Sequence, residues 1–120
     1  MEVGVIASIL VVDDDPQMTR LVSILLTREG YEVVTLDSAG EALKRITAEE
    51  FDLLLTDWNM PGMTGDQLAM ESKRLKPTVP VILMTGVPTF TGAVGIDATL
   101  RKPFTSAELK HLVGSFLTSE

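Results

Sequence analysis

Acidic side chains follow two apolar runs in this sequence of 120 residues. Asp13, Asp14 and Asp15 come directly after Ile9–Val12 in ILVVDDDP, and Asp57 follows the apolar run of LLLTDWNMPG. Adjacent carboxylates repel one another, so such a cluster is stabilised by a cation or by protonation of one member. Carboxylate oxygens without cysteine or histidine suit Mg²⁺, which completes its shell with water and phosphate oxygens.

Two further polar residues stand at similar places later in the chain. Thr85 follows the apolar run of PVILMTG, and Lys102 lies in LRKPF. A hydroxyl and an ammonium group facing the carboxylates can hold the oxygens of a phosphoryl group. We therefore predict a Mg²⁺-assisted phosphoryl-transfer site, in which one carboxylate itself can be the nucleophile and form an acyl phosphate.

The elements that position these residues are short apolar runs alternating with amphipathic stretches. The predicted strands are Ile9–Val12, Glu32–Leu36, Asp52–Thr56, Val79–Met84 and Thr99–Leu100 with its neighbours. The first, third and fourth runs are nearly continuous Val, Ile and Leu, which is typical of strands buried on both faces. The second run is mixed, which favours a place at the edge of the sheet.

Helix signals lie between the runs. Asp15 before Pro16 predicts a cap and a helix start, and Gly30 predicts the end of that helix. Its expected core-facing stripe is Met18, Leu21, Val22 and Leu25. Later helix starts are indicated by Ser38–Glu41, by Gly65 (with a helix to about Lys76) and by Thr105–Glu108, and the last stripe is Leu109, Leu112, Val113, Phe116 and Leu117.

Alternating strands and helices predict a single α/β domain with a doubly wound parallel sheet and helices on both faces. Ligands of such sheets bind beyond the carboxyl ends of the strands, where Asp13, Asp14, Asp57 and Thr85 fall. The segment 86–97 has three glycines and Pro88, so we expect a fourth helix there to be short or disordered, with mobility over 87–95.

Composition excludes several classes of function. The chain has no cysteine and one histidine, so thiolate chemistry and a multi-histidine zinc site are excluded. A net charge of −7 argues against direct binding to nucleic acid. With no signal peptide and no membrane-length apolar run, we expect a cytoplasmic protein with a lead-in at 1–8 and a domain at 9–118.

Four motifs together, VVDDDP, LLLTDWNMPGMTG, PVILMTG and LRKPF, resemble those of the receiver domains of two-component response regulators. The resemblance extends from about Ser8 to Leu117 and implies a flavodoxin-like sheet with strand order 2-1-3-4-5. It implies that Asp57 accepts a phosphoryl group from a histidine kinase or phosphotransfer protein, and that a conformational change then signals to a downstream effector.

The resemblance also implies a role for each site residue. Asp13, Asp14, Asp57 and the backbone carbonyl of Asn59 would hold Mg²⁺. Lys102 would pair with the phosphoryl oxygens and Thr85 would hydrogen-bond to them. A cis peptide is expected at Lys102–Pro103, since only X–Pro bonds make the cis form accessible at low cost.

Two departures from the family pattern affect the expected output. Thr99 stands where the family usually has an aromatic residue that turns inward on activation. Thr85 and Lys102 are 17 positions apart (102 − 85), which is more than a helical turn shorter than usual. The face formed by the fourth helix, fifth strand and last helix is therefore expected to differ from that of relatives.

Alternative functions follow from the same residues. One is a receiver that docks partners without phosphorylation, and another is a phosphatase with Asp13 as nucleophile and Asp15 as acid. A flavin-binding protein is a third alternative, suggested by TGVPTFTG. We expect His111 to be a surface residue, Trp58 to lie partly exposed beside the site, and Ile24 to be exposed on the first helix, where relatives often meet their kinase.

Overall fold

The computed structural model describes residues 6–86 and 95–117. Strands and helices follow one another along the chain until β4, which is followed by β5 and the last helix. The elements are β1 (Ser8–Val12), α1 (Pro16–Arg28), β2 (Glu32–Leu36), α2 (Ala39–Ala48), β3 (Leu53–Asp57), α3 (Gly65–Leu75), β4 (Val81–Thr85), β5 (Ala98–Arg101) and α4 (Ser106–Leu117).

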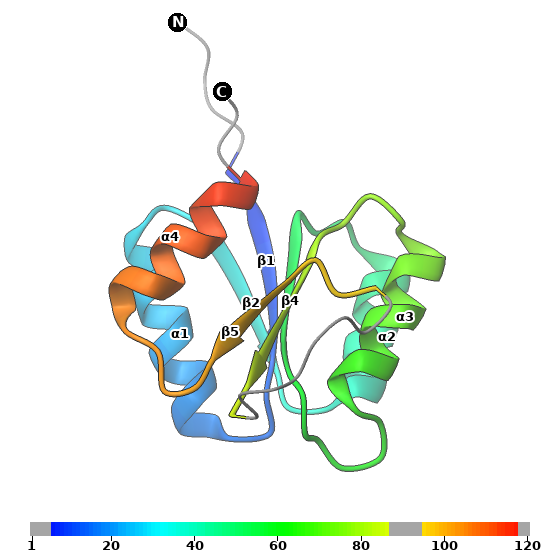
Figure 1. Cartoon of the computed structure of the whole chain (residues 1–120). Helices are drawn as coiled ribbons and strands as arrows, with labels where there is room; N and C mark the ends of the chain where they lie inside the picture. Colours follow the sequence, from blue (N-terminus) through cyan, green and yellow to red (C-terminus); the bar gives the residue numbers. More distant parts are fainter. Residues whose placement is uncertain (1–5, 87–94, 118–120) are drawn as a thin grey trace, which may run out of the picture.

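The five strands form one parallel sheet in the order β2-β1-β3-β4-β5. Helices α1 and α4 cover one face and α2 and α3 cover the other (Figure 1). The predicted three-layer, doubly wound architecture and strand order are confirmed, as is the place of β2 at an edge. No helix within the described ranges has the length and hydropathy needed to span a bilayer.

Side chains that alternate along the strands form a core on each side of the sheet. The core on the α1/α4 side contains Ile9, Val11, Val22, Leu26, Leu53, Leu55, Ile82, Met84, Leu100, Leu109 and Val113. The core on the α2/α3 side contains Leu10, Val12, Ala39, Ala42, Ile46, Phe51, Leu54, Met60, Leu68, Ala69 and Val81. Strands β1, β3 and β4 supply residues to both cores, which explains their nearly continuous apolar sequences.

The predicted helix starts are confirmed by side-chain hydrogen bonds. Asp15 caps α1 by accepting from the N–H of Gln17 (3.0 Å), and Ser38 Oγ accepts from the N–H of Glu41 (3.2 Å). At α4 the two bonds of a capping box are present: the N–H of Glu108 donates to Thr105 Oγ1 (3.0 Å), and the N–H of Thr105 donates to Glu108 Oε1 (2.8 Å). Local sequence thus determines where these three helices begin.

Two expectations are corrected by the structure, and a third concerns residues outside the described ranges. Leu21 was predicted to face the core but is 48% exposed, because α1 instead turns Val22 and Leu26 inward. Asp57 and Thr85 are the last residues of their strands rather than the residues after them. The short or disordered fourth helix and the mobility over 87–95 fall on residues 87–94, which lie outside the described residues.

Candidate functional site

The carboxyl ends of the strands are held together by backbone hydrogen bonds that continue the sheet. The N–H of Asp13 donates to the carbonyl of Leu36 (3.1 Å), and the N–H of Lys102 donates to that of Thr85 (2.7 Å). Between them, the residue after Asp57 donates its N–H to the carbonyl of Met84 (2.9 Å). Residues from distant parts of the sequence therefore meet at the carboxyl-terminal end of the sheet, and hydrogen bonds fix their backbone positions.

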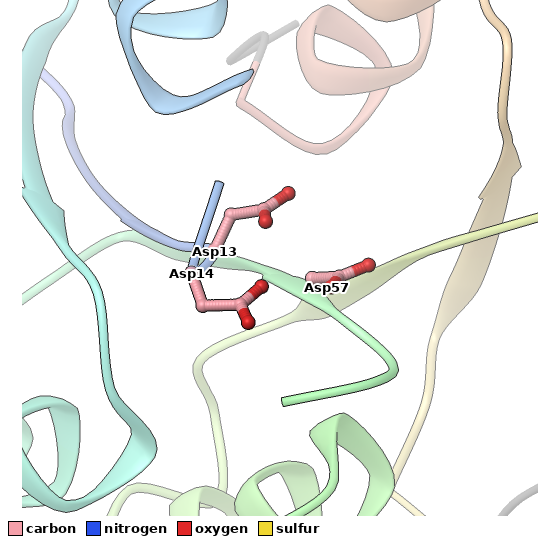
Figure 2. Close-up of side chains that lie close together, drawn as sticks. All are labelled: Asp13, Asp14 and Asp57. Carbon is pink, nitrogen blue, oxygen red and sulfur yellow. The ribbon is translucent and has the colours of Figure 1, made fainter. Parts of the chain in front are cut away.

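Three carboxylates lie close together at this end of the sheet. One oxygen from each of Asp13, Asp14 and Asp57 lies within 4.8 Å of the others. In Figure 2 the side chains of Asp13 and Asp14, from the end of β1, extend to the same side as Asp57, from the end of β3. Asp13 is buried (1% exposed) and Asp57 nearly so (8%), whereas Asp14 is exposed. The predicted acidic cluster is present, and its three carboxylates differ in how deeply they are buried.

Lys102 joins two of these carboxylates. Its Nζ lies 2.8 Å from Asp57 Oδ1 and 3.2 Å from Asp13 Oδ2, and its side chain is 24% exposed. The ion pair links the residue after β5 to the residue after β1, which are 89 sequence positions apart. An ammonium group in this position offsets part of the negative charge of the cluster.

The surroundings raise the pKa of both Asp13 and Lys102. Burial raises the pKa of Asp13 above its ordinary value, and the nearby Asp57 carboxylate adds to this effect. The backbone N–H of Asp15 and the Lys102 ammonium oppose the rise and only partly offset it. Burial lowers the pKa of Lys102, but its hydrogen bond to Asp57 and the two negative charges outweigh burial and leave the pKa raised. Lys102 is therefore a permanent cation in the site.

Asp15 is separated from the cluster, as predicted. Its carboxylate accepts from the N–H of Gln17, and its own N–H donates to Asp13 Oδ1 (2.9 Å). This backbone bond orients the Asp13 side chain toward the site. Asp15 thus begins α1 and positions Asp13 through its main chain.

Gly65 is a supporting residue whose role the sequence analysis missed. Its N–H donates to the carbonyl of Trp58 (2.7 Å), which brings the start of α3 against the end of β3. A Cβ at this position would lie 2.7 Å from Leu83 Cδ1, 2.9 Å from Trp58 Cα and closest of all to the carbonyl oxygen of Asp57. The only available signal was a glycine at a helix start, and this does not distinguish close packing from backbone flexibility.

Two further predicted site residues, Thr85 and Asn59, stand at or just after the carboxyl ends of β4 and β3. Thr85 is buried (3% exposed) at the end of β4, and Asn59 is exposed two residues after Asp57. Trp58 is partly exposed and His111 is exposed on α4, both as predicted. The Lys102–Pro103 peptide is cis, also as predicted.

The donor set fits a magnesium ion. All three clustered ligands are carboxylate oxygens, which Mg²⁺ prefers, and they leave room for water on the exposed side at Asp14.

Comparison with known sequences places the chain in one family. The profile of the response regulator receiver domain family matches residues 9–114. Transcriptional regulatory protein GlrR of Escherichia coli K12 is 39% identical over 102 residues, which cover 81% of this chain and 23% of that protein. Response regulator protein FleR of Pseudomonas aeruginosa is 38% identical over 112 residues, or 89% and 24% of the two chains. The chain thus spans about a quarter of the length of these relatives.

Solved structures agree in fold over nearly the whole chain. The response regulator TrrA of Thermotoga maritima, in complex with Mg²⁺ and BeF, is 34% identical with a TM-score of 0.88, covering 93% of this chain and all of that one. Chemotaxis protein CheY4 of Vibrio cholerae is 31% identical with a TM-score of 0.85, covering 94% and 100%. Receiver domains are signalling domains that bind Mg²⁺ at an acidic pocket and interact with histidine kinases and downstream effectors. The chain described here belongs to the family of response regulator receiver domains.

Proposed function

We propose that Asp57 is the phosphoryl acceptor of this receiver domain. The observation that carries the proposal is the geometry of Lys102, whose ammonium group contacts Asp57 Oδ1 at 2.8 Å while also contacting Asp13. The Asp57 carboxylate at the end of β3 attacks the phosphorus of a phosphohistidine, the bond from phosphorus to the histidine nitrogen breaks, and an acyl phosphate forms. Lys102 then pairs with oxygens of the transferred group.

Asp13, Asp14, Asp57 and the backbone carbonyl of Asn59 are the proposed ligands of Mg²⁺. When bound, the ion neutralises charge on the phosphoryl oxygens and orients them for transfer. Asp13 is held in place for this role by the N–H of Asp15. Thr85, at the end of the neighbouring strand β4, is the proposed hydrogen-bond donor to the phosphoryl group.

The proposed donor is a histidine kinase or phosphotransfer protein, and the output is a conformational change read by a downstream effector. The domain catalyses its own phosphorylation and dephosphorylation and acts on no other substrate. We place the domain at residues 9–118, with a lead-in at 1–8, and expect it in the cytoplasm. Direct contact with nucleic acid or with a membrane is not part of the proposed role.

The exposed apolar side chains of α1 support a docking role for this helix. Ile24 is 42% exposed and Leu21 is 48% exposed, and positions three apart are neighbours on a helix. Replacing Ile24 by aspartate should slow transfer from the partner kinase and leave phosphorylation by a small donor unchanged. Equal effects on both reactions would contradict docking through α1.

The acceptor is tested by intact-mass measurement after incubation with a small phosphoryl donor and Mg²⁺. The wild-type chain should gain one phosphoryl group, and Asp57→Asn, which has nearly the same shape but lacks the nucleophile, should gain none. Absence of an adduct on the wild-type chain, with small donors and with a panel of kinases, would instead favour the docking function without phosphorylation.

The phosphatase alternative is disfavoured by the position of Asp15. The acid of such an enzyme must face the substrate, but the Asp15 carboxylate accepts from Gln17 at the start of α1. Turnover of a generic phosphate ester that survives Asp57→Asn and is abolished by Asp13→Asn would restore this alternative.

A further inference from the structure

Arg101 is a cation at the edge of the site to which the resemblance assigned no role. It is the last residue of β5 and pairs in register with Thr85, the last residue of β4. Paired positions on neighbouring strands lie about 4.8 Å apart. The N–H of Lys102, which donates to the carbonyl of Thr85 at 2.7 Å, fixes the backbone of Arg101 beside that residue.

The alternation of side chains places Arg101 and Thr85 on the same face of the sheet. Met84 and Leu100 both belong to the core on the α1/α4 side. The residue after each of them points to the opposite face, which α2 and α3 cover. Arg101 therefore approaches the strand ends from the α2/α3 side, next to Thr85.

Among the described residues of β5, Thr99 and Arg101, on the α2/α3 side, are exposed, whereas Leu100 between them is only 6% exposed. Within residues 6–86 and 95–117, Arg101 takes part in no ion pair. Its guanidinium group thus forms no ion pair with any carboxylate of the described residues.

No other cation of the chain stands at a strand end apart from Lys102. The remaining eight lie on helices or at the end of α3: Arg20, Arg28, Lys44, Arg45, Lys73, Arg74, Lys76 and Lys110. Six of these lie on α2, α3 or α4 or at the end of α3, and Arg28 lies in the last turn of α1. Arg101 is therefore the one cation besides Lys102 that stands at the end of a strand instead of on a helix.

Charge balance shows when a second cation is required. Three ionised aspartates, Lys102 and one Mg²⁺ sum to zero (−3 + 1 + 2). Phosphorylation replaces the single charge of Asp57 by about two negative charges, which leaves the site at about −1. A planar guanidinium group forms strong, paired hydrogen bonds with phosphoryl oxygens.

We propose that Arg101 is a second phosphoryl-binding residue, whose guanidinium group contacts the anion on Asp57 from the α2/α3 side while Lys102 contacts it from the α1/α4 side. The inference rests on the proposed function, because the anion concerned is the phosphoryl group accepted by Asp57. The inference gives β5 a charged side chain that responds to phosphorylation. Thr99 of the same strand has no aromatic ring that could do so.

The test uses beryllofluoride, the group bound with Mg²⁺ in the TrrA structure. It is titrated at saturating Mg²⁺ into the wild-type chain, Arg101→Gln, Arg101→Lys and the control Arg28→Gln, with the fluorescence of Trp58 as the signal. Arg101→Gln should bind beryllofluoride about tenfold more weakly, as expected for loss of a charge-assisted hydrogen bond. Arg28→Gln removes the same charge from the far end of α1 and should stay within about twofold of wild type.

A second titration, with Mg²⁺ alone, separates a phosphoryl contact from a structural role. Removing a cation near the carboxylates should leave Mg²⁺ affinity unchanged or increase it, and Arg101→Lys should recover part of the beryllofluoride affinity. Equal beryllofluoride affinity in Arg101→Gln and Arg28→Gln would overturn the inference, and so would a parallel loss of Mg²⁺ affinity. Identical titrations for the wild-type chain and Asp57→Asn would refute the proposed function itself, and this inference with it.

Discussion

Asp13, Asp14 and Asp15 have the same side chain and different surroundings. Asp13 is buried and contacts Lys102, Asp14 is exposed within the cluster, and Asp15 caps a helix. The chain turns from strand to helix within these three residues, so their side chains point in different directions. This difference in direction determines the three environments. Identical carboxyl groups should therefore respond differently to the same substitution.

Replacing Asp14 by asparagine should weaken Mg²⁺ binding by about tenfold or more, because a charged ligand is lost. Asp15→Asn should change the affinity by less than about twofold, because asparagine caps helices as well as aspartate does. Isothermal titration with Mg²⁺ measures both values. Equal losses in the two variants would contradict the separation of Asp15 from the site.

Asp13→Asn should increase the free energy of unfolding at neutral pH without metal. The raised pKa of Asp13 means that its ionisation is less favourable in the folded chain than in the unfolded one. The wild-type chain thus loses stability as pH rises from the ordinary aspartate pKa through the raised value, and the variant lacks this loss.

Denaturant unfolding of the two chains in a chelator, measured across this pH range, checks the sign. The stability advantage of Asp13→Asn should be absent at acidic pH and grow as pH rises. Saturating Mg²⁺ should remove the advantage, because the wild-type carboxylate then has a cation. An advantage that is constant across pH would show that ionisation of Asp13 is not its cause.

At the scale of elements, the junction of β3 and α3 positions Asp57. The N-terminus of α3 packs so closely on the end of β3 that Gly65 has no space for a methyl group. Two of the three nearest atoms belong to the backbone of Asp57 and Trp58, which cannot move aside as the Leu83 side chain can. Packing between these two elements therefore controls the position of the proposed phosphoryl acceptor.

Gly65→Ala should lower the free energy of unfolding by about 1–3 kcal/mol, the usual cost of overpacking. It should also slow phosphorylation, because relief of the clash moves Asp57. The matched control is Gly40→Ala in α2, where a Cβ meets nothing within 4 Å, and which should stabilise the chain by about 0.4–1 kcal/mol. Denaturant unfolding measures both, and a neutral Gly65→Ala would disprove the close packing.

At the scale of the whole molecule, the site exists only in the folded chain. Its ligands come from the ends of β1 and β3, and Lys102 reaches them from beyond β5. The chain also carries a net charge of −7, so clustering three carboxylates adds to an existing repulsion. An ion that binds this cluster must stabilise the fold as a whole.

Mg²⁺ at one hundred times its dissociation constant should stabilise the fold by about 2.7 kcal/mol, which for a domain of this size raises Tm by about 10 °C. Thermal unfolding with Mg²⁺ and with a chelator measures the shift, at equal ionic strength adjusted with NaCl. The shift should fall strongly in Asp14→Asn. An equal shift in that variant would show general screening of negative charge instead of binding at the site.

The sequence by itself determined the strands, the helix starts and the ends at which the acidic residues stand. These features depend on local patterns: continuous Val, Ile and Leu in β1, β3 and β4, and capping residues such as Asp15 and Ser38. The family motifs also predicted the strand order and the residues of the site. Neither prediction follows from a local sequence pattern.

Only the tertiary structure decided what depends on contacts between distant segments. The rotation of α1 that exposes Leu21 follows from packing on the sheet, because a helix with apolar residues on a broad face can turn either of two stripes inward. The pKa of Asp13 depends on its burial and on Asp57 and Lys102, which are distant in sequence. The place of Arg101 beside Thr85 likewise follows from the register of β4 and β5, which no short stretch of sequence contains.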